Sequence, residues 1–212
     1  MPKKSRLVYG KSGEVNIENK CDYLRETKTL WLPISVGQDY HESSKLEESI
    51  KLIIKNFKHI TLIRIIIVDL AQRYHLAIRN NSSPEDMIEE AREKGLFWKD
   101  SYSELIKSQF KDTTVEFITW EYWLEHDAYK EARNQINDLY NDTKNEFKEN
   151  LEKDVLEFQR RFLNREGRGF TEHQKEYCRE CIKEECAILI VWNKDQVSID
   201  YSYIFEPVNH FV

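Results

Sequence analysis

The sequence predicts a doubly wound α/β fold around a parallel sheet. The segment 60–69 is almost continuously apolar and β-branched, which is what a strand covered on both faces requires. Shorter strand-like runs occur at 31–35, 114–120 and 197–201, and segments with helical spacing separate them. The resulting order of strand, helix, strand, helices, strand, helix, strand is typical of a doubly wound sheet.

The helices between these strands are predicted from apolar spacing. A helix from about Ser44 places apolar side chains on one face: Leu46, Ile50, Ile53, Ile54 and Phe57. A second helix follows the 60–69 strand directly, through Tyr74 and Leu76. Residues 121–162 are rich in charge and predict a long helical stretch.

Helix ends are predicted from caps and breakers. Residues 83–86 are typical of a helix start, and this helix is expected to stop near Gly95. Residues 165–169 predict a loop rich in glycine and arginine. Thr171 is the expected cap of a final helix that runs to Trp192.

The composition of the 212-residue chain favours a single domain over residues 1–212, with residues 1–25 as a candidate flexible arm. The formal net charge of -6 argues against bulk nucleic-acid binding but permits a local basic face. The longest apolar run, 60–70, contains Arg64 and is too short to cross a membrane. Because the N-terminus lacks an apolar signal region, a cytoplasmic and reducing setting is expected.

Ligands of doubly wound sheets bind beyond the carboxyl ends of the strands. This rule predicts that four residues at strand ends surround one crevice: Ser35, Asp69, Trp120 and Tyr201. These side chains are therefore the first functional candidates.

Ser35 is the candidate nucleophile. Pro33 stands where the first glycine of the GxSxG turn belongs, so a serine hydrolase of the α/β-hydrolase type is disfavoured. The chain also lacks GxGxxG and GxxxxGK[ST], which leaves nucleotide binding through a glycine-rich loop unsupported. A strand-end serine is more often a cap or turn residue, so the pattern alone leaves its role open.

Glu184 and Glu185 border an apolar helical run, where burial raises the proton affinity of a carboxylate and suits it to acid–base work. A solvated helix face is the alternative. His41 and His75 lack metal-ligand spacing and are interpreted as structural, so no metal site is expected. The lone CxxC at 178–181 is interpreted as reduced helix cysteines for the same reason.

Arginines gather before the final helix: Arg160, Arg161, Arg165 and Arg168. Within an acidic chain, such clustering fits a face that contacts phosphates, although solvated helix charges are the ordinary explanation.

Four motifs follow one another along the chain: ISVGQDYHESSK at 34–45, VDLAQRYHL at 68–76, the tryptophan segment at 120–129, and EECA followed by Trp192, Tyr201 and Pro207. In this order they resemble the motifs of the tRNA-dependent cyclodipeptide synthases, and the serine motif is closest to the subfamily often labelled XYP. The matches cover most of the chain.

The resemblance implies a Rossmann-like parallel sheet with helices on both faces, similar to the catalytic domain of class I aminoacyl-tRNA synthetases. It implies an aminoacyltransferase that joins two aminoacyl-tRNAs into a cyclic dipeptide by a ping-pong mechanism through an aminoacyl-Ser35 enzyme. No cofactor, metal or membrane contact is implied, and a monomer is the family's default. Glu185 is implied to hold the substrate amino group and relay protons, and Tyr201 to line the site.

On the same basis, substrate contacts are expected at Pro33, Gly37, Gln38, Tyr40, His41, Asp69, Arg73, Cys181 and Ser202. Contacts with tRNA are expected at Arg160, Arg161 and Arg165.

The chain departs from the family pattern at three positions. The catalytic tyrosine four residues before the glutamate is Cys181, whose thiol cannot copy a phenol's reach, and Tyr177 one turn earlier is a candidate substitute. Ser202 replaces the subfamily's proline. Pro33 replaces a small residue that lines the first aminoacyl pocket in many relatives.

Three alternatives follow. Cys181 favours a catalytically weakened homologue that binds aminoacyl-tRNA. A serine hydrolase lacks its expected turn. A structural α/β interaction module would leave the combination of Ser35, Glu185 and Tyr201 unexplained.

Overall fold

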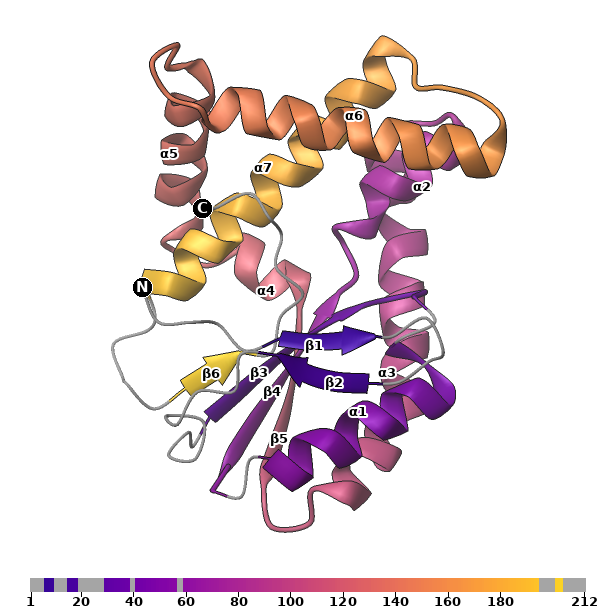
Figure 1. Cartoon of the computed structure of the whole chain (residues 1–212), viewed down its shortest axis with the longest axis vertical. Helices are drawn as coiled ribbons and strands as arrows, with labels where there is room; N and C mark the ends of the chain where they lie inside the picture. Colours follow the sequence, from indigo (N-terminus) through magenta and orange to yellow (C-terminus); the bar gives the residue numbers. More distant parts are fainter. Residues whose placement is uncertain are drawn as a thin grey trace. The chain divides into compact units, whose positions relative to one another are not determined.

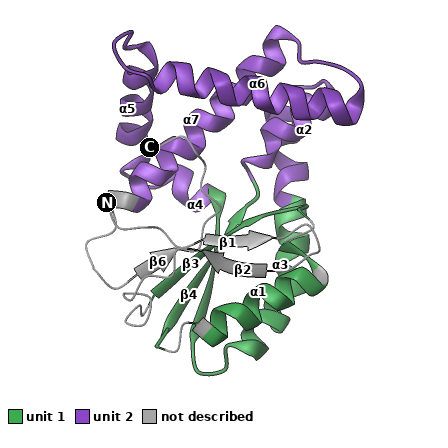
Figure 2. Ribbon diagram, in the orientation of Figure 1, with its two compact units in different colours: residues 1–69, 93–120, 196–208 green, residues 70–92, 121–195, 209–212 purple. Residues whose placement is uncertain are grey.

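The computed structural model describes residues 6–9, 15–18, 29–38, 41–56, 59–194 and 201–203 (Figure 1). The chain divides into two compact units (Figure 2). Unit 1 takes residues 1–69, 93–120 and 196–208, and unit 2 takes residues 70–92, 121–195 and 209–212. Among the described residues, no helix is long and apolar enough to span a membrane.

Unit 1 is built around a parallel sheet with the strand order β5-β4-β3-β6. Its strands are β3 (Thr29–Ser35), β4 (Leu62–Val68), β5 (Thr114–Thr119) and β6 (Tyr201–Tyr203). The chain adds β4 and β5 on one side of β3 and then returns to add β6 on the other. The order therefore reverses at β3, as expected of a doubly wound sheet. A separate antiparallel pair is formed by β1 (Arg6–Tyr9) and β2 (Val15–Glu18).

One face of the sheet carries the described core of unit 1. Alternate residues of β3 and β4 contribute to it, because successive side chains of a strand point to opposite faces: Leu30, Leu32, Ile34, Ile63, Ile65 and Ile67. Two helices, α1 (Ser43–Asn56) and α3 (Ile88–Gln109), complete the same cluster with Leu46, Ile50, Ile53, Trp98 and Ile106. Helices on the second face stay a prediction. Ile54 was expected in the core but is 38% exposed, because it lies at the edge of the apolar stripe of α1.

The expected end of a helix at Gly95 is wrong, since α3 continues to Gln109. A Cβ at Gly95 would lie 2.5 Å from the Cβ of Asp69 and 2.8 Å from its Oδ2. The glycine therefore permits a close approach between α3 and the end of β4, and it does not terminate the helix.

Unit 2 is helical. It contains α2 (Gln72–Asn80), the short 3-10 turn η3 (Glu85–Met87), α4 (Trp120–Leu124, from residue 121 onward), α5 (Tyr129–Asn141), α6 (Phe147–Glu166) and α7 (Glu172–Lys194). The long helical stretch expected over 121–162 is thus three helices. Asx turns explain the second break: Asp142 Oδ1 accepts from the N–H of Lys144 at 2.9 Å, and Asn145 Oδ1 accepts from the N–H of Phe147 at 2.8 Å.

The start of α7 confirms the predicted cap. Thr171 Oγ1 accepts a hydrogen bond from the N–H of Gln174 at 3.2 Å, and Gln174 Oε1 accepts one from the N–H of Thr171 at 2.9 Å. This reciprocal pair is a capping box. The helix packs against α2, α5 and α6, which buries most of its length from Cys178 to Trp192.

Candidate active site

Ser35 is the last residue of β3 and is followed by a tight turn. The N–H of Gln38 donates to the carbonyl of Ser35 at 3.3 Å, and the N–H of His41 donates to the carbonyl of Gln38 at 2.8 Å. Gly37 has a φ of 78°, in the region that favours glycine. Gly37 and Gln38 are both exposed, and partly buried Pro33 lies beside Ile66 of β4.

His41 fixes this turn from within unit 1. Its Nδ1 accepts a hydrogen bond from the backbone N–H of Ser35 at 2.8 Å. Its carbonyl accepts a hydrogen bond from Trp98 Nε1 at 2.9 Å, which ties the turn to α3. Burial lowers the pKa of His41 to about 4, so the imidazole is neutral and Nδ1 can accept at neutral pH.

Asp69 follows β4 at the same sheet edge as Ser35, since β3 and β4 pair up to Ser35↔Val68. The residue is 3% exposed, and its Oδ1 accepts a hydrogen bond from the N–H of Trp120 at 3.0 Å. Asp69 therefore joins the ends of β4 and β5, and Trp120 is itself buried. Asp69 was expected to contact substrate. The hydrogen bond to Trp120 shows that it also has a structural role.

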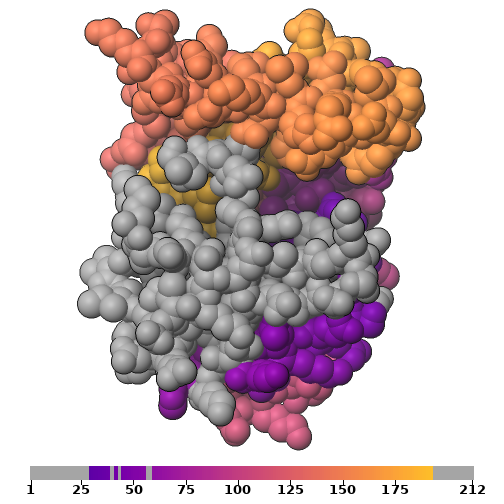
Figure 3. Space-filling view, viewed as in Figure 1, coloured from indigo at the N-terminus to yellow at the C-terminus, as the bar shows by residue number. Residues whose placement is uncertain are grey.

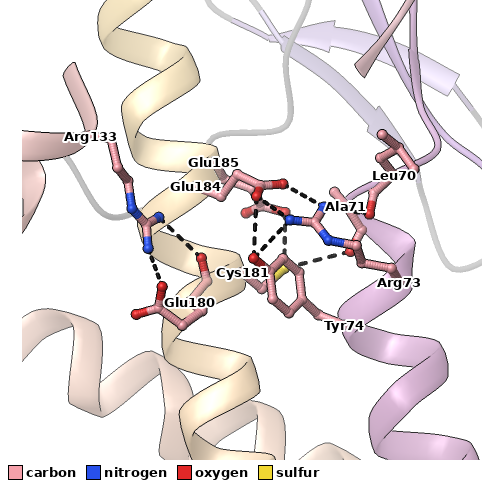
Figure 4. A network of polar contacts seen from close by, with 9 residues as sticks. All are labelled: Leu70, Ala71, Arg73, Tyr74, Arg133, Glu180, Cys181, Glu184 and Glu185. Carbon is pink, nitrogen blue, oxygen red and sulfur yellow. Dashed lines mark hydrogen bonds and ion pairs between the residues drawn. The ribbon is translucent and has the colours of Figure 1, made fainter. Parts of the chain in front are cut away.

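Unit 2 holds a buried polar network around Glu184 (Figure 4). Arg73 Nη1 donates to Glu184 Oε1 at 2.9 Å, and Arg73 Nη2 donates to Oε2. Arg73 Nη2 also donates to the hydroxyl of Tyr74 at 2.9 Å, and that hydroxyl donates to Glu184 Oε2 at 3.2 Å. The side chain of Glu184 is 4% exposed and that of Arg73 14%. The solvated face considered for Glu184 is therefore wrong.

Glu185 lies next to this network and has a different environment. Burial, and then the charge of Glu184, raise the pKa of Glu185 to about 7. Cys181 Sγ lies 3.9 Å from Glu185 Oε1 and 3.9 Å from the carbonyl oxygen of Ala71. A carboxyl group with a pKa near neutrality can both accept and return a proton.

The phenols near the glutamates come from other helices than α7. Tyr74 on α2 contacts Glu184 directly. Burial and the charge of Glu184 raise the pKa of Tyr129, at the start of α5, to about 12. Tyr177, the candidate substitute for the missing tyrosine, is not among the residues of the network in Figure 4, where Cys181 is the α7 side chain beside Glu185.

Tyr201 is not at the expected end of the sheet. β6 pairs with β3 in parallel register, with Tyr201 opposite Thr29 and Tyr203 opposite Trp31. Thr29 and Ser35 are six residue steps apart along the strand, which is about 20 Å. Of the four residues expected at one edge of the sheet, Ser35, Asp69 and Trp120 therefore lie there and the backbone of Tyr201 does not. For Tyr201 and Ser202 only the backbone is described, and Tyr40, Pro207 and residues 197–200 of the expected last strand lie outside the described residues.

The arginines expected to contact tRNA lie at the carboxyl end of α6, whose side chains reach the surface of unit 2 (Figure 3). Arg160 and Arg161 are exposed, and both form ion pairs with Glu157, at 2.7 and 2.9 Å. Arg165 is also exposed. Arg168 differs, because its guanidinium donates to the carbonyl of Arg79 at 2.8 Å and supports the end of α2.

The cysteines of α7 are free thiols and are buried: Cys178, Cys181 and Cys186. Burial raises the pKa of each of them. Within the described part of the chain, no three His, Cys, Asp or Glu side chains gather in a way that could hold a metal ion.

Sequence reasoning did not find the pairing of Arg73 with Glu184, whose partners are 111 residues apart. It placed His41 among the structural histidines but did not find its bond to Ser35. A signal for both existed, because Arg73 and His41 each lie within a few residues of a predicted strand end.

Comparison with known proteins gives one kind of match. No protein-family model and no curated protein sequence matches the chain. A cyclodipeptide synthase from Fluoribacter dumoffii matches in structure with a TM-score of 0.74 and 22% identity, over 91% of this chain and 80% of its own. One from Candidatus Glomeribacter gigasporarum, solved bound to Phe-tRNAPhe, gives a TM-score of 0.62 and 16% identity, over 79% and 74%.

This chain has the fold of the cyclodipeptide synthases. A further match, from Mycobacterium tuberculosis, is described as demonstrating that cyclodipeptide synthetases are related to type I tRNA synthetases; its TM-score is 0.53 at 16% identity, over 79% of this chain and 68% of its own. The predicted Rossmann-like fold is thereby confirmed, while the XYP subfamily stays a prediction. At these identities the likeness establishes the fold alone.

Proposed function

We propose that this chain is a tRNA-dependent cyclodipeptide synthase that uses two aminoacyl-tRNAs and a covalent aminoacyl-Ser35 intermediate. The observation that carries the proposal is the position of Ser35, at the carboxyl end of the strand where the sheet order reverses, in a fold shared with cyclodipeptide synthases. Ligands of doubly wound sheets bind at that position. The Phe-tRNA bound to one structural relative supports the substrate class.

The reaction balances without a cofactor, because an aminoacyl-tRNA is already an activated ester. Ser35 Oγ attacks the carbonyl of the first ester, loses its proton, and releases the tRNA with a free ribose hydroxyl. The amino group of the aminoacyl-enzyme then attacks the second aminoacyl-tRNA, which releases the second tRNA and leaves a dipeptide on Ser35. The free amino group of that dipeptide attacks the Ser35 ester, closes the ring and regenerates the serine.

Glu185 is proposed to accept and return protons of the attacking amines. Each amine must lose a proton as the new bond forms, and a carboxylate with a pKa of about 7 is matched to that task at neutral pH. Its carboxylate form is the base, so the rate of amine attack should rise as the pH increases through about 7.

The other residues of the proposed site are assigned roles on different grounds. The role of Tyr201 rests on the resemblance alone, since its backbone pairs with Thr29. Tyr177 is at most an accessory group. Asp69 and Arg73 are proposed to hold the framework of the site, because both are already bonded to protein groups. Arg160, Arg161 and Arg165 are the proposed tRNA contacts, and a cytoplasmic monomer is the proposed state.

The experiment is product detection coupled to acyl-enzyme trapping. Expression in a bacterial host should add cyclic dipeptides to the spent medium, identified by mass spectrometry against an empty-vector culture. Purified protein mixed with radiolabelled aminoacyl-tRNA should retain label after denaturation. Ser35→Ala should abolish both signals, and Ser101→Ala, a change at an exposed serine on α3, should alter neither. Label on Ser35→Ala at the level of the natural protein would place the nucleophile elsewhere.

A weakened homologue that binds aminoacyl-tRNA without making product is the second candidate. Cys181 favours it, because a buried thiol with a raised pKa stands beside Glu185 where the family has a phenol. Tight aminoacyl-tRNA binding in a filter assay, without covalent label or cyclic product, would select this candidate over the synthase.

A further inference from the structure

The pair formed by Arg73 and Glu184 lies beside Glu185 and connects α2 to α7. The two Nη atoms of Arg73 each donate to one oxygen of the Glu184 carboxylate. This bidentate arrangement is the strongest form of an arginine–carboxylate ion pair. Arg73 Nη1 is also bound to the carbonyl of Leu70 at 2.8 Å, and the guanidinium lies 4.2 Å from the centre of the Tyr74 ring. Glu184 is therefore held by several hydrogen bonds and is largely shielded from bulk water, with 4% of its side chain exposed.

The pair acts unequally on Glu185. Glu184 is the neighbour of Glu185 in sequence, and its negative charge raises the pKa of the Glu185 carboxyl group. Arg73 binds Glu184 and not Glu185. Among the described residues, its hydrogen bonds go to Leu70, Tyr74 and Glu184. The negative charge of Glu184 therefore affects Glu185 more strongly than the positive charge of Arg73 does.

A purely architectural role is the competing explanation, and the same helix supplies a comparison for it. Arg133 of α5 forms a second ion pair with Glu180, one turn before Glu184, and also binds the carbonyl of Glu180 at 3.3 Å. Glu180 is shared with Lys183 at 2.9 Å and its side chain is 35% exposed. This pair also joins α7 to another helix, but Glu180 is not among the groups that raise the pKa of Glu185.

We propose that Glu184, held in place by Arg73 and Tyr74, is a positioning residue for the proposed reaction: its fixed negative charge strengthens Glu185 as a base, so that the carboxylate of Glu185 accepts the proton of the attacking substrate amine and returns it to the departing oxygen. The inference deepens the proposed function and rests on it for the identity of that amine. Glu184 itself touches no substrate in this scheme.

Other titratable groups surround the two glutamates and must be held constant in a test. They are Cys178, Cys181 and Cys186 on α7, Arg73 and Tyr74 on α2, Tyr129 and Arg133 on α5, and Asp154 on α6. The thiols have raised pKa values and stay neutral near pH 7, and the two arginines stay charged throughout. Among these groups, Glu185 is the one expected to titrate close to neutrality.

The test measures the titration of Glu185 directly and separately from turnover. Carbon-13 NMR of carboxyl-labelled protein, assigned with Glu185→Gln, reports the midpoint of Glu185. In Glu184→Gln this midpoint should fall by roughly one pH unit, because the neighbouring negative charge is removed. The rise of cyclic-dipeptide formation with pH should shift down equally. Glu180→Gln is the matched control and should move neither curve.

Glu184→Gln leaves Arg73 buried without its carboxylate, so the variant could fail to fold. The double variant Arg73→Met/Glu184→Met replaces the pair with apolar side chains, a change that proteins often tolerate. It should also lower the Glu185 midpoint relative to the natural protein. A midpoint within about 0.3 pH units of the natural value in either folded variant overturns the inference, which then reduces to architecture. If the midpoint shifts but the natural protein makes no cyclic dipeptide, the proposed function fails while the electrostatic relationship stands.

Discussion

The backbone N–H of Ser35 donates a hydrogen bond to Nδ1 of His41 at 2.8 Å. The two residues are six positions apart, and the bond closes the turn that follows β3. Because Nδ1 accepts, the neutral ring carries its proton on Nε2. His41 therefore fixes the backbone that presents the candidate nucleophile, a task different from the substrate contact implied by the family resemblance.

Removing this acceptor should slow acylation of Ser35. In His41→Ala the partly buried Ser35 N–H loses its acceptor and the turn that presents Ser35 is no longer held, so acyl-enzyme formation should fall about tenfold. In His41→Asn the side-chain oxygen can stand in for Nδ1 and should restore most of the rate. Single-turnover labelling with radiolabelled aminoacyl-tRNA measures both. An equal decrease in the two variants would mean that the ring itself, rather than its acceptor, is required.

The contact between Gly95 and Asp69 predicts a stability effect. A methyl group at Gly95 would meet the Asp69 side chain at 2.5 Å, so Gly95→Ala should destabilise unit 1 by about 1–3 kcal/mol in urea unfolding. Gly169→Ala is the control, because its added carbon would lie an ordinary 3.5 Å from Gln159 Nε2. If Gly95→Ala is as stable as Gly169→Ala, the close approach of α3 to β4 is wrong.

These positions show how far sequence reasoning reaches. The strands at 60–69 and 114–120 and the cap at Thr171 follow from local rules and are confirmed. The end predicted at Gly95 is wrong because a local rule treats glycine as a breaker, whereas here a distant aspartate requires it.

The site shows the same division between local and distant information. The end of β3 identifies Ser35, and the apolar helix around Glu185 predicts its raised pKa. The partners of Glu184 and the register of Tyr201 depend on pairings between distant segments, on which hydrophobic periodicity carries no information.

Partly buried His75 on α2 predicts how stability depends on pH. Burial, aided by the charges of Arg165 and Arg79, lowers its pKa to about 4 from an ordinary 6.5. The unfolded chain therefore binds a proton before the folded protein does, so stability is lost as pH falls from about 6.5 to about 4, on the order of 2–3 kcal/mol. His75→Phe, which keeps the ring contact with Phe158, should lack this loss.

The comparison is made as the difference between the two proteins at pH 7 and pH 4. Glu185 acts in the opposite sense over the same range, because its pKa is raised, but it is common to both proteins and cancels. Parallel stability curves for His75→Phe and the natural protein would show that His75 does not titrate abnormally.

The arginines at the end of α6 predict the salt dependence of tRNA binding. Arg160→Glu/Arg161→Glu/Arg165→Glu should weaken binding, and the slope of log affinity against log salt should become shallower by about 0.7–0.9 for each phosphate that the variant no longer neutralises. Because Glu157 already pairs with Arg160 and Arg161, the two share one carboxylate and retain positive charge. Lys107→Glu/Lys111→Glu in unit 1 is the control for a local reversal of charge. An unchanged slope in the arginine variant would move the tRNA contact off α6.

The replacement of the family tyrosine by Cys181 gives the last prediction. Cys181 is 5% exposed, with Sγ 3.9 Å from both the Ala71 carbonyl and Glu185, so a tyrosine there lacks room and should cost about 1–3 kcal/mol of stability. Cys181→Tyr should therefore lower product yield rather than raise it, although the family pattern alone suggests a gain. Cys181→Ser should be well tolerated, since it keeps the size and the hydrogen bond.

The same assay ranks the phenols. Side chains on a helix lean toward its N-terminus, which directs Tyr177 away from Glu185, so Tyr177→Phe should cost less than about twofold in cyclic-dipeptide formation. Tyr74→Phe should cost more, because it removes the hydroxyl that bridges Arg73 and Glu184. Glu185→Gln should abolish turnover. A Tyr177→Phe protein as inactive as Glu185→Gln would reverse this ranking and identify Tyr177 as the displaced phenol of the reaction.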